Sequence, residues 1–315
     1  MDKSKNIIVT GGAGLAGQNL VVELKSQGYK NITIFDKNEE NLEILKSLHP
    51  ELPIYQQDIT VSGPWEEKFK NCDCLVMLHA QISGLSYDIF EKNNIEATSH
   101  LIDLVKKYNV PYTVHISSSV VVSKSDDFYT RSKKDQEEVV IKSGIKHCIL
   151  RPTLMFGWFD PKHLGWLARL MEKVPFFPIP GDGKFLRQPL YVRDFVRAII
   201  KCIETEPQGD IYDLVGPDEI DYVDIIKEIK KTRGLKTVIF HIPYNLFKTS
   251  LKLAALVMKK PPFTAQQLDA LSAGDYFTGV DIEKTFGFKP THFLDALKET
   301  WSHPKYSRIV LRSPH

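Results

Sequence analysis

Short apolar runs alternate with amphipathic segments through the first half of the chain. Six runs have the length and composition of buried strands, at residues 6–10, 31–36, 54–57, 74–78, 112–116 and 147–150. The segments between them, such as residues 15–27 and 129–142, repeat apolar residues at helical spacing. Strands that alternate with helices in this way predict an α/β fold. Right-handed crossovers then give a doubly wound parallel sheet covered on both faces.

The pattern changes after residue 157. Proline and aromatic residues become frequent, and one further apolar run, at residues 211–215, precedes a mostly helical remainder. We therefore expect the chain to pass more than once between a sheet domain and a smaller, mostly helical cap over the carboxyl ends of the strands. The expected sheet domain comprises residues 1–157 and about 188–216, and the cap comprises about 158–187 and 217–315.

The first apolar run leads directly into a glycine cluster at the start of a helix. Gly11 permits a sharp turn, Gly14 lets a ligand approach the backbone, and Gly17 lets the helix pack close to the strand. The N-terminus of a helix carries unpaired N–H groups and a partial positive charge, which suits a pyrophosphate. We expect a phosphate-binding turn here, with Leu15 and Ala16 beside the glycines.

The second apolar run ends in a carboxylate, Asp36, about 20 residues beyond the glycines. An acid at this position accepts both ribose hydroxyls of an adenosine and repels a 2′-phosphate, which favours NAD over NADP. Two observations compete with this interpretation. Asp36 could instead cap the helix expected at residues 38–48, and a basic residue just beyond the acid, Lys37, can support NADP.

The third and fourth runs also end in candidate ligand-binding residues. Asp58 and Ile59 close the third run, and His79, Ala80 and Gln81 close the fourth. Ligands of open parallel sheets lie at the carboxyl ends of the strands. We therefore expect Asp58 to meet the adenine amino group and Ala80 to line the cofactor path.

Candidate catalytic groups follow the fifth run. Tyr129 and Lys133 are four residues apart, so they share one face of a helix. An ammonium group close to the phenol favours the phenolate and would lower the pKa of the tyrosine toward neutrality. Such a tyrosine can take a proton from an alcohol as hydride leaves, or return one to a carbonyl. Ser118 or Ser119 can hydrogen-bond the same substrate oxygen, and Lys133 can reach the nicotinamide ribose.

These motifs resemble the extended short-chain dehydrogenases/reductases, in particular the NAD-dependent epimerase/dehydratase family that acts on nucleotide-activated sugars. The matching positions are Thr10-Gly11-x-x-Gly14-x-x-Gly17, Asp36, Asp58-Ile59, His79-Ala80, Asn94-Ile95-x-x-Thr98, Ser117-Ser118, Tyr129-x-x-Ser132-Lys133, Arg151-Pro152-Thr153, Arg187 and Tyr191-Val192-x-Asp194.

The resemblance implies a Rossmann-type fold, NAD as the cofactor and a homodimer formed through the helices that contain residues 98–105 and 137–141. It also implies that Asn94 lies near the cofactor, that His79 is a structural or cofactor-side histidine, and that Arg187, Thr153 and Tyr191 contact the substrate. The catalytic serine is Ser118 when counted from the strand and Ser119 when counted back from Val122. We prefer Ser118.

Departures from the family pattern narrow the expected reaction. Ser119 and Val120 stand where the 4,6-dehydratases carry an Asp–Glu pair, so elimination of water is not expected. Leu154 stands where an asparagine often contacts the substrate diphosphate, and Val280 lies where a second arginine is usual.

The main hypothesis is therefore hydride transfer at a secondary hydroxyl or keto carbon, C4, of a nucleotide-activated sugar. One alternative is a 4-epimerase that retains NAD through the cycle. Another is a non-catalytic NAD(H)-binding structural or regulatory protein, although relatives of that kind usually lack the tyrosine or the lysine, and both are present here.

The composition mainly argues against particular partners and kinds of site. The 315 residues carry a formal net charge of +2, which gives no strong electrostatic case for nucleic acid or an anionic membrane. The four cysteines form no CxxC pair, which fits a reducing, cytoplasmic location, and the histidines lack the spacing of metal ligands. We expect neither a signal peptide nor a membrane span. An apolar segment with basic flanks, residues 246–260, could lie on a membrane surface or a partner, although we favour a helix buried on one face.

Overall fold

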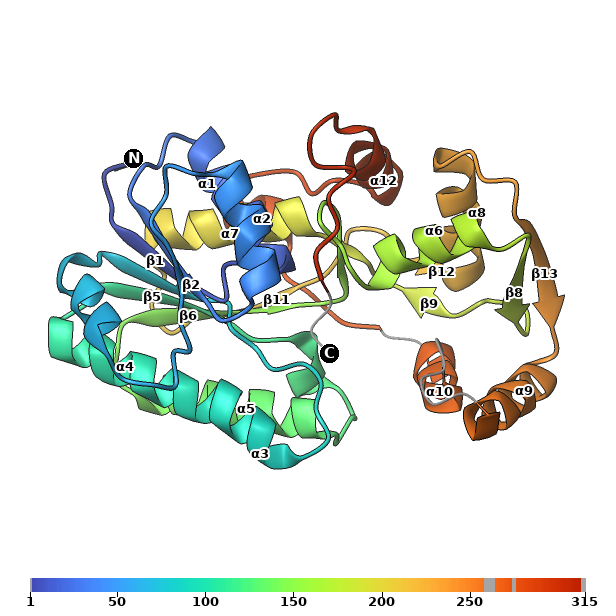
Figure 1. The fold of residues 1–315 in the computed structure, drawn as a ribbon, viewed down its shortest axis with the longest axis horizontal. Helices are drawn as coiled ribbons and strands as arrows, with labels where there is room; N and C mark the ends of the chain where they lie inside the picture. The colour runs from blue at the N-terminus through green and yellow to red at the C-terminus, as the bar shows by residue number, and fades with distance from the viewer. Residues whose placement is uncertain (1, 258–263, 274–275, 313–315) are drawn as a thin grey trace.

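The computed structural model describes residues 2–257, 264–273 and 276–312. Its first lobe is built on a seven-stranded parallel sheet in the order β11-β6-β5-β4-β1-β2-β3, which confirms the predicted doubly wound arrangement (Figure 1). The strands are β1 (Ile7–Thr10), β2 (Ile32–Asp36), β3 (Ile54–Gln56), β4 (Cys74–Met77), β5 (Tyr112–Ile116), β6 (His147–Pro152) and β11 (Ile211–Leu214).

Helices cover both faces of this sheet, as Figure 1 shows. One face packs against α1 (Leu15–Ser26), α2 (Glu39–Leu48) and α7 (Val192–Thr205), and the other against α4 (Ala97–Tyr108) and α5 (Phe128–Lys142). The central strands are apolar on both faces, because neither face meets water. Val9 and Val76 pack on one face, and their neighbours Ile8 and Leu75 pack on the other.

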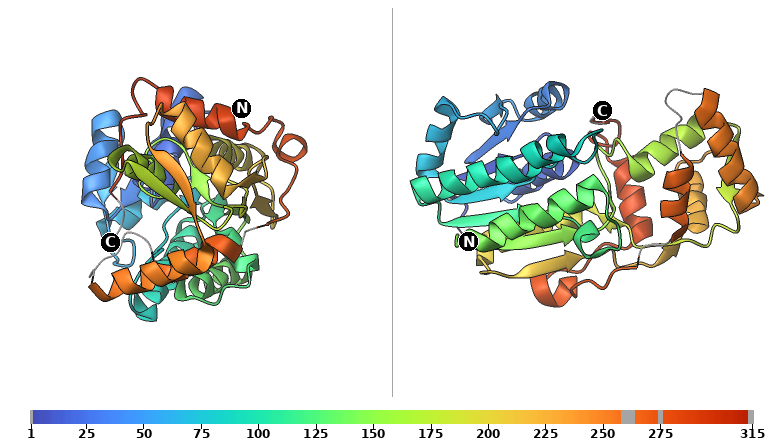
Figure 2. Two further views of the ribbon diagram at one scale, coloured as in Figure 1. Left: turned by 90° about the vertical axis from the view of Figure 1, so that its right-hand side faces the viewer. Right: turned by 90° about the horizontal axis from the view of Figure 1, so that it is seen from below.

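The second lobe lies beside the end of the sheet where β4, β5 and β6 terminate (Figures 1 and 2). It has an apolar core of its own, to which Phe177, Ile179, Ile226 and Phe293 contribute. Its helices are α6 (His163–Lys173), α8 (Tyr222–Thr232), α9 (Tyr244–Val257), α10 (Ala265–Ala273) and α12 (Phe293–Ser302). Short strand pairs join them: β8 (Phe176–Pro180) with β13 (Val238–Ile242), β9 (Leu186–Arg187) with β12 (Ile220–Asp221), and β7 (Met155–Phe156) with β10 (Leu190–Tyr191).

The chain passes between the lobes more than once. After the first excursion it returns as α7 and β11, and β11 pairs in parallel with β6. Helix α11 (Ile282–Phe286), which the predicted division assigns to the cap, places Ile282 and Phe286 in the core of the first lobe. The division itself stays a prediction, and this packing favours counting α11 with the sheet domain.

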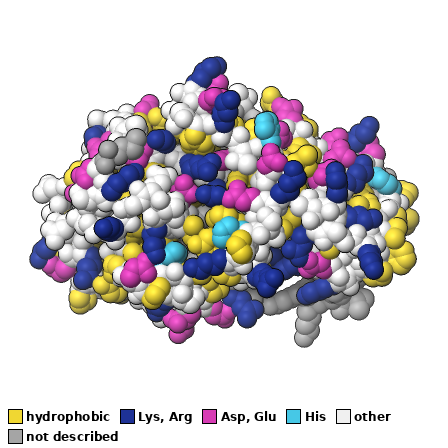
Figure 3. Space-filling view, turned by 90° about the horizontal axis from the view of Figure 1, so that it is seen from above, with side chains coloured by type: hydrophobic (Ala, Val, Ile, Leu, Met, Phe, Trp, Pro, Cys, Tyr) yellow, Lys and Arg dark blue, Asp and Glu magenta, His cyan; other side chains and the backbone are white. Residues whose placement is uncertain are grey.

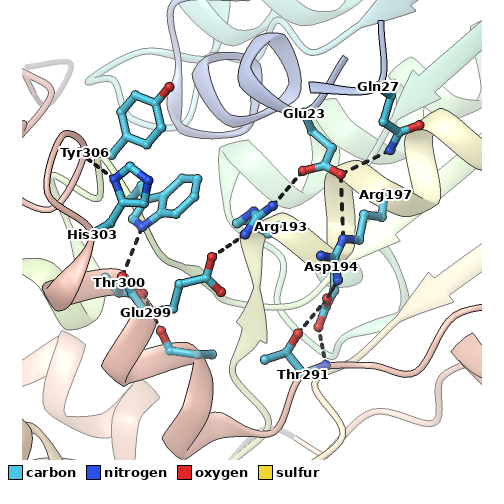
Figure 4. Close-up of polar contacts among 12 residues, drawn as sticks. Glu23, Gln27, Arg193, Asp194, Arg197, Thr291, Glu299, Thr300, His303 and Tyr306 are labelled. Carbon is cyan, nitrogen blue, oxygen red and sulfur yellow. Dashed lines mark hydrogen bonds and ion pairs between the residues drawn. The ribbon is translucent and has the colours of Figure 1, made fainter. Parts of the chain in front are cut away.

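An ion-pair network joins the lobes (Figure 4). Arg193, on α7, binds Glu23 of α1 at 2.9 Å and also binds Glu299 of α12. Its guanidinium lies over the Trp158 ring, 4.7 Å from the centroid. The next residue, Asp194, accepts hydrogen bonds from the backbone N–H and the hydroxyl of Thr291 at 2.6 and 2.9 Å. Charged groups of α7 therefore tie three distant parts of the chain together.

One segment differs from expectation. The helix expected between residues 87 and 108 is interrupted, because α3 (Tyr87–Phe90) and α4 are joined by a π-helical segment, η2 (Glu91–Glu96).

The apolar segment at residues 246–260 forms most of α9. One face of this helix, with Phe247, Leu251 and Ala254, is half-buried, and Leu246 and Leu253 are exposed. Residues 258–260 of the segment lie outside the described residues. No helix within the described ranges is long and apolar enough to cross a membrane.

Candidate active site

The turn between β1 and α1 has the geometry that its glycines predict. Gly11 has φ +72°, and a Cβ there would lie 2.5 Å from the backbone nitrogen of His79. A Cβ on Gly17 would lie 2.4 Å from the backbone of Gly12. At Gly14 the nearest such atom is the Gly11 carbonyl oxygen at 3.4 Å, so the outer side of the turn is open. The start of α1 is therefore accessible to a phosphate.

Asp36 lies against this turn. Its carboxylate accepts hydrogen bonds from the backbone N–H groups of Ala13 and Asn38, each at 2.9 Å. Burial raises the pKa of this carboxyl group, although the two hydrogen bonds oppose the shift. The alternative role as a helix cap is wrong, because the side chain of Asn38 caps α2 through the Asn41 N–H at 3.0 Å. The ammonium of Lys37, the basic residue that follows Asp36, donates a hydrogen bond to the side-chain oxygen of Asn93 at 2.5 Å.

Local hydrogen bonds hold the two residues that follow the third strand, Asp58 and Ile59. The Asp58 carboxylate accepts hydrogen bonds from the N–H and the hydroxyl of Thr60, at 3.0 and 2.7 Å. Ile59 is buried, and its carbonyl oxygen lies 2.8 Å from Nδ1 of His100. The predicted contact of Asp58 with adenine stays a prediction.

His79 is a buried link between strands and helix rather than a titrating group. Its Nδ1 lies 3.0 Å from the Thr10 hydroxyl and its Nε2 lies 3.1 Å from the Thr98 hydroxyl. Burial lowers the pKa of His79 to about 3, with further lowering by the charges of Lys133 and Lys37. The imidazole is therefore neutral and fixes β1 and β4 to α4.

Asn94 clamps the loop after β4. Its side-chain oxygen accepts the Gln81 N–H at 2.6 Å, and its amide nitrogen donates to the Gln81 carbonyl at 3.1 Å and to the Ser132 hydroxyl at 2.9 Å. The π-helical segment turns this side chain toward the loop. Asn94 thus fixes the position of Ala80 and Gln81, whose contact with the cofactor stays a prediction.

Lys133 is fully buried in α5. Its ammonium donates to the Ile116 carbonyl oxygen at 2.9 Å and to the side-chain oxygen of Gln136. Burial lowers the pKa of Lys133 to about 7, although the charge of Glu137 acts in the opposite direction. Gln136 in turn donates to the Thr98 hydroxyl at 2.7 Å.

The positioning role of Gln136 and Thr98 was missed from the sequence. The signal was present, because α5 buries polar residues at positions 132, 133, 136 and 137, spaced as one helical face. A buried polar stripe of this kind indicates a hydrogen-bonded network rather than core packing.

Tyr129 and Ser118 meet at the carboxyl end of β5, where the Ser118 hydroxyl hydrogen-bonds the phenol. Burial raises the pKa of Tyr129, and the hydrogen bond with Ser118 lowers it. The depression predicted from Lys133 is not found, because the ammonium is directed at Ile116 and Gln136 instead. Ser119 is buried at the start of the short 3-10 turn η3 (Ser119–Val122). The geometry therefore favours Ser118 over Ser119.

The three predicted substrate residues do not form one group. Tyr191 is 1% exposed and packs on Phe156, with ring centroids 5.6 Å apart. The Tyr191 ring lies inside the second-lobe core, and its substrate contact stays a prediction. Thr153 is also buried and donates to the Gln188 carbonyl at 3.0 Å, and its substrate contact likewise stays a prediction. Arg187 lies on β9, where it binds the Leu271 carbonyl oxygen, and its substrate contact stays a prediction.

Exposed apolar side chains surround the same edge of the sheet. They follow three neighbouring strands: β4, β5 and β6. Because parallel strands end at one edge, these side chains lie at the same edge of the sheet as Tyr129. We call them the mouth residues: Ile82, Leu85, Val122, Phe128 and Leu154. Among the described residues, no group of three or more His, Cys, Asp or Glu is arranged to hold a metal ion.

The sheet, the glycine turn and the Ser118–Tyr129–Lys133 arrangement define an extended short-chain dehydrogenase/reductase. A family model described as the NAD-dependent epimerase/dehydratase family matches residues 7–214. The chain belongs to this family, and its cofactor is NAD. The open side of Gly14 and the Asp36 carboxylate fit the pyrophosphate and the adenosine ribose of that cofactor.

Curated relatives span most of the chain at low identity. One is the decarboxylating sterol-4-alpha-carboxylate 3-dehydrogenase of Dictyostelium discoideum, 25% identical over 292 residues, which cover 81% of this chain and 85% of the relative. Another is the 4-hydroxy-2-methyl-3-oxo-4-farnesyl-3,4-dihydroquinoline-1-oxide ketoreductase of Stigmatella aurantiaca, 21% identical over 267 residues, which cover 78% of each chain.

Solved structures share the fold. The UDP-glucose 4-epimerase of Thermotoga maritima, bound to UDP-glucose, has a TM-score of 0.72 at 20% identity and covers 94% of this chain and 97% of its own. The dTDP-glucose 4,6-dehydratase of Streptomyces venezuelae, with NAD bound, has a TM-score of 0.72 at 20% identity and covers 93% and 95%.

Proposed function

We propose that the chain is an NAD-dependent dehydrogenase or ketoreductase that transfers a hydride at a secondary hydroxyl or keto carbon. The observation that carries the proposal is the Ser118–Tyr129 hydrogen bond at the carboxyl end of β5, one helical turn from the buried Lys133. NAD, when bound, supplies the hydride acceptor in one direction and the hydride donor in the other.

The side chains would handle the proton and the substrate oxygen. Tyr129 takes the hydroxyl proton as the C–H hydride leaves, or returns a proton to the carbonyl oxygen in the reverse direction. Ser118 orients that oxygen by a hydrogen bond. Lys133, whose pKa burial lowers to about 7, can hold or release a proton near neutral pH, and Gln136 keeps it in place.

The mouth residues support a large, mainly apolar substrate. Exposed apolar side chains at an active-site edge favour a partner whose own surface is apolar. The names of the curated relatives point the same way, since one acts on a sterol carboxylate and another on a farnesylated quinoline oxide. Leu154, at a position where a diphosphate contact is usual, fits this substrate class.

A nucleotide-activated sugar, oxidised at C4 or epimerised there with retained NAD, is the second candidate. Arg187, the predicted phosphate ligand, and the nucleotide sugars named with the structural neighbours support it. The homodimer and the cytoplasmic location also remain predictions.

A substrate panel tests these proposals. The purified chain is incubated with NAD and with sterol, isoprenoid and nucleotide-sugar alcohols, while NADH absorbance is followed. Replacement of Tyr129 by Phe is expected to lower kcat roughly 10²–10⁴-fold without changing Kd for NAD. Tyr108→Phe is the matched control, because that phenol hydrogen-bonds Glu67 at the other end of the sheet from Tyr129.

Each outcome separates the hypotheses. Unchanged turnover in Tyr129→Phe would reject the catalytic role. An isomerised nucleotide sugar with no net NADH would support the epimerase, and NAD binding without turnover of any compound in the panel would favour the non-catalytic alternative.

A further inference from the structure

The two-stranded β8–β13 sheet at the end of the second lobe has an apolar outer face. The strands are parallel, with Phe176 opposite Val238 and Pro178 opposite Phe240. Successive side chains of a strand point to opposite faces. Phe177 and Ile179 point into the core of the lobe, whereas Phe176, Val238 and Phe240 are 61%, 50% and 40% exposed.

We call Phe176, Pro178, Val238 and Phe240 the outer β8–β13 face. A solvated sheet face normally carries polar side chains, and every one of these four is apolar. The Phe176 and Phe240 rings lie together, with centroids 6.4 Å apart. The face is therefore a continuous apolar surface rather than a set of scattered exposed residues.

Basic side chains border one end of this face. Lys173 precedes β8 and Lys236 precedes β13, and both are exposed. Because the strands are parallel, the two lysines lie at the same end of the sheet. Neither forms an ion pair within the described part of the chain, and the nearby acid Glu172 is already bound by Arg233. Figure 3 shows hydrophobic and basic side chains together at the end of the molecule where β8 and β13 lie in Figure 1.

We propose that the outer β8–β13 face binds the surface of an anionic phospholipid membrane. The phenyl rings enter the boundary between headgroups and acyl chains, and Lys173 and Lys236 contact the phosphate-bearing headgroups. The small net charge of the whole chain does not oppose this, because the positive charges are local to the face. A second copy of the chain fits less well, since the four residues of this face offer the two lysines no acidic partner.

The proposal does not depend on the reaction at Tyr129. It concerns a surface of the second lobe, and membrane binding can be measured without turnover. If both proposals hold, the enzyme works at a lipid surface, which suits an apolar alcohol or ketone as the substrate.

Vesicle flotation tests the proposal directly. The full chain is mixed with vesicles of phosphatidylcholine alone or of phosphatidylcholine with phosphatidylglycerol. We expect binding to the mixed vesicles, and a roughly fivefold loss of partitioning for each of Lys173→Gln and Lys236→Gln. The double variant Phe176→Ser/Phe240→Ser is expected to lose binding.

Matched controls use exposed residues of the first lobe. Val61→Ser and Lys30→Gln remove the same kinds of group elsewhere and are expected to bind like the unmodified chain. Circular dichroism and Kd for NAD confirm that each variant is folded.

Three results would overturn the proposal. They are failure of the unmodified chain to bind mixed vesicles, equal binding by the double phenylalanine variant, and a dimer in light scattering that the same double substitution dissociates. The last result would show that a second copy covers the face.

Discussion

Burial strongly changes the acid–base chemistry of the Lys133 side chain. Its pKa is about 7 in the folded chain, against 10.5 for the free side chain. Between these values the unfolded state binds the extra proton, so the free energy of unfolding rises with pH through this window. The cost of burying Lys133 is fully present below about pH 7 and is relieved as pH rises.

Replacement of Lys133 by Met is therefore expected to reduce the increase of the unfolding free energy between about pH 7 and about pH 10. Urea unfolding at about pH 7 and about pH 10 measures the effect, with the exposed Lys30→Met as control. An unchanged slope in Lys133→Met would show that the lysine keeps its proton in the folded chain.

The two candidate serines are separated by a second pair of variants. Ser118 hydrogen-bonds the phenol of Tyr129, whereas Ser119 is buried at the start of a turn. Ser118→Ala is expected to lower kcat roughly a hundredfold, because a hydrogen bond to the reacting oxygen is lost, and Ser119→Ala to change it little. Steady-state kinetics with the substrate found in the panel measures both. The opposite order of effects would assign the role to Ser119.

For single residues, the sequence predicts which ones occupy the site better than it predicts the burial and the contacts of their side chains. Asp36, Ser118 and Tyr129 lie at the strand ends and helix turn that the sequence predicts, whereas their ligand contacts stay predictions. The effect of Lys133 on Tyr129 could not be predicted, because spacing reveals neither how deeply an ammonium is buried nor which carbonyl it faces. The burial of Tyr191 could not be predicted for a similar reason, because a family motif does not show how deeply an aromatic ring packs.

The β1–α1 turn offers a prediction at the scale of elements. A Cβ at position 17 would overlap the Gly12 backbone, whereas one at position 14 would make only ordinary contact, 3.4 Å from the Gly11 carbonyl oxygen. Gly17→Ala is expected to destabilise the chain by about 1–3 kcal/mol, because rigid backbone must move. Gly14→Ala is expected to leave the melting temperature nearly unchanged but raise Kd for NAD about tenfold, since the methyl group occupies the ligand side of the turn.

Thermal melting and NAD titration of both variants measure this contrast. Equal melting temperatures for the two variants would contradict the packing argument. Unchanged NAD affinity in Gly14→Ala would place the pyrophosphate elsewhere.

The elements of the first lobe were predictable because their signals are local. Buried strands such as β5 stand out as apolar runs, and its bounds agree with the prediction. The pairs β9–β12 and β7–β10 have two residues per strand, too few for any periodicity. Their existence depends on partners that are distant in the sequence, so no local pattern shows them.

The lobes are joined through α7, which gives a prediction for the whole molecule. Removal of the Arg193 side chain would leave Glu23 and Glu299 without their main partner, and Glu23 is buried. Arg193→Ala is expected to cost about 3 kcal/mol of unfolding free energy. Denaturant unfolding measures this, with Arg312→Ala as the matched control.

The control breaks the ion pair between Arg312 and Glu40, in which both side chains are exposed. Its expected cost is under about 1 kcal/mol, because water screens such pairs. Equal costs for Arg193→Ala and Arg312→Ala would show that the network of Figure 4 adds little to stability.

The arrangement of the lobes was only partly predictable. The change of pattern at residue 157 indicates the second lobe, but contacts such as Asp194 with Thr291 bridge 97 residues of sequence. The mouth residues likewise come from three separate loops, and each looks ordinary in its own stretch. Only the fold brings them to one edge of the sheet.

The π-helical segment Glu91–Glu96 has an evolutionary consequence. A π turn carries one residue more than an α turn, so loss of a single codon would convert η2 into regular α-helix. That deletion would favour the helix itself, yet it would rotate the preceding residues by about 100° relative to those that follow. The amide of Asn94 would then leave Gln81 and Ser132. Descendants of this chain should therefore tolerate substitutions in the helix far more readily than changes in its length.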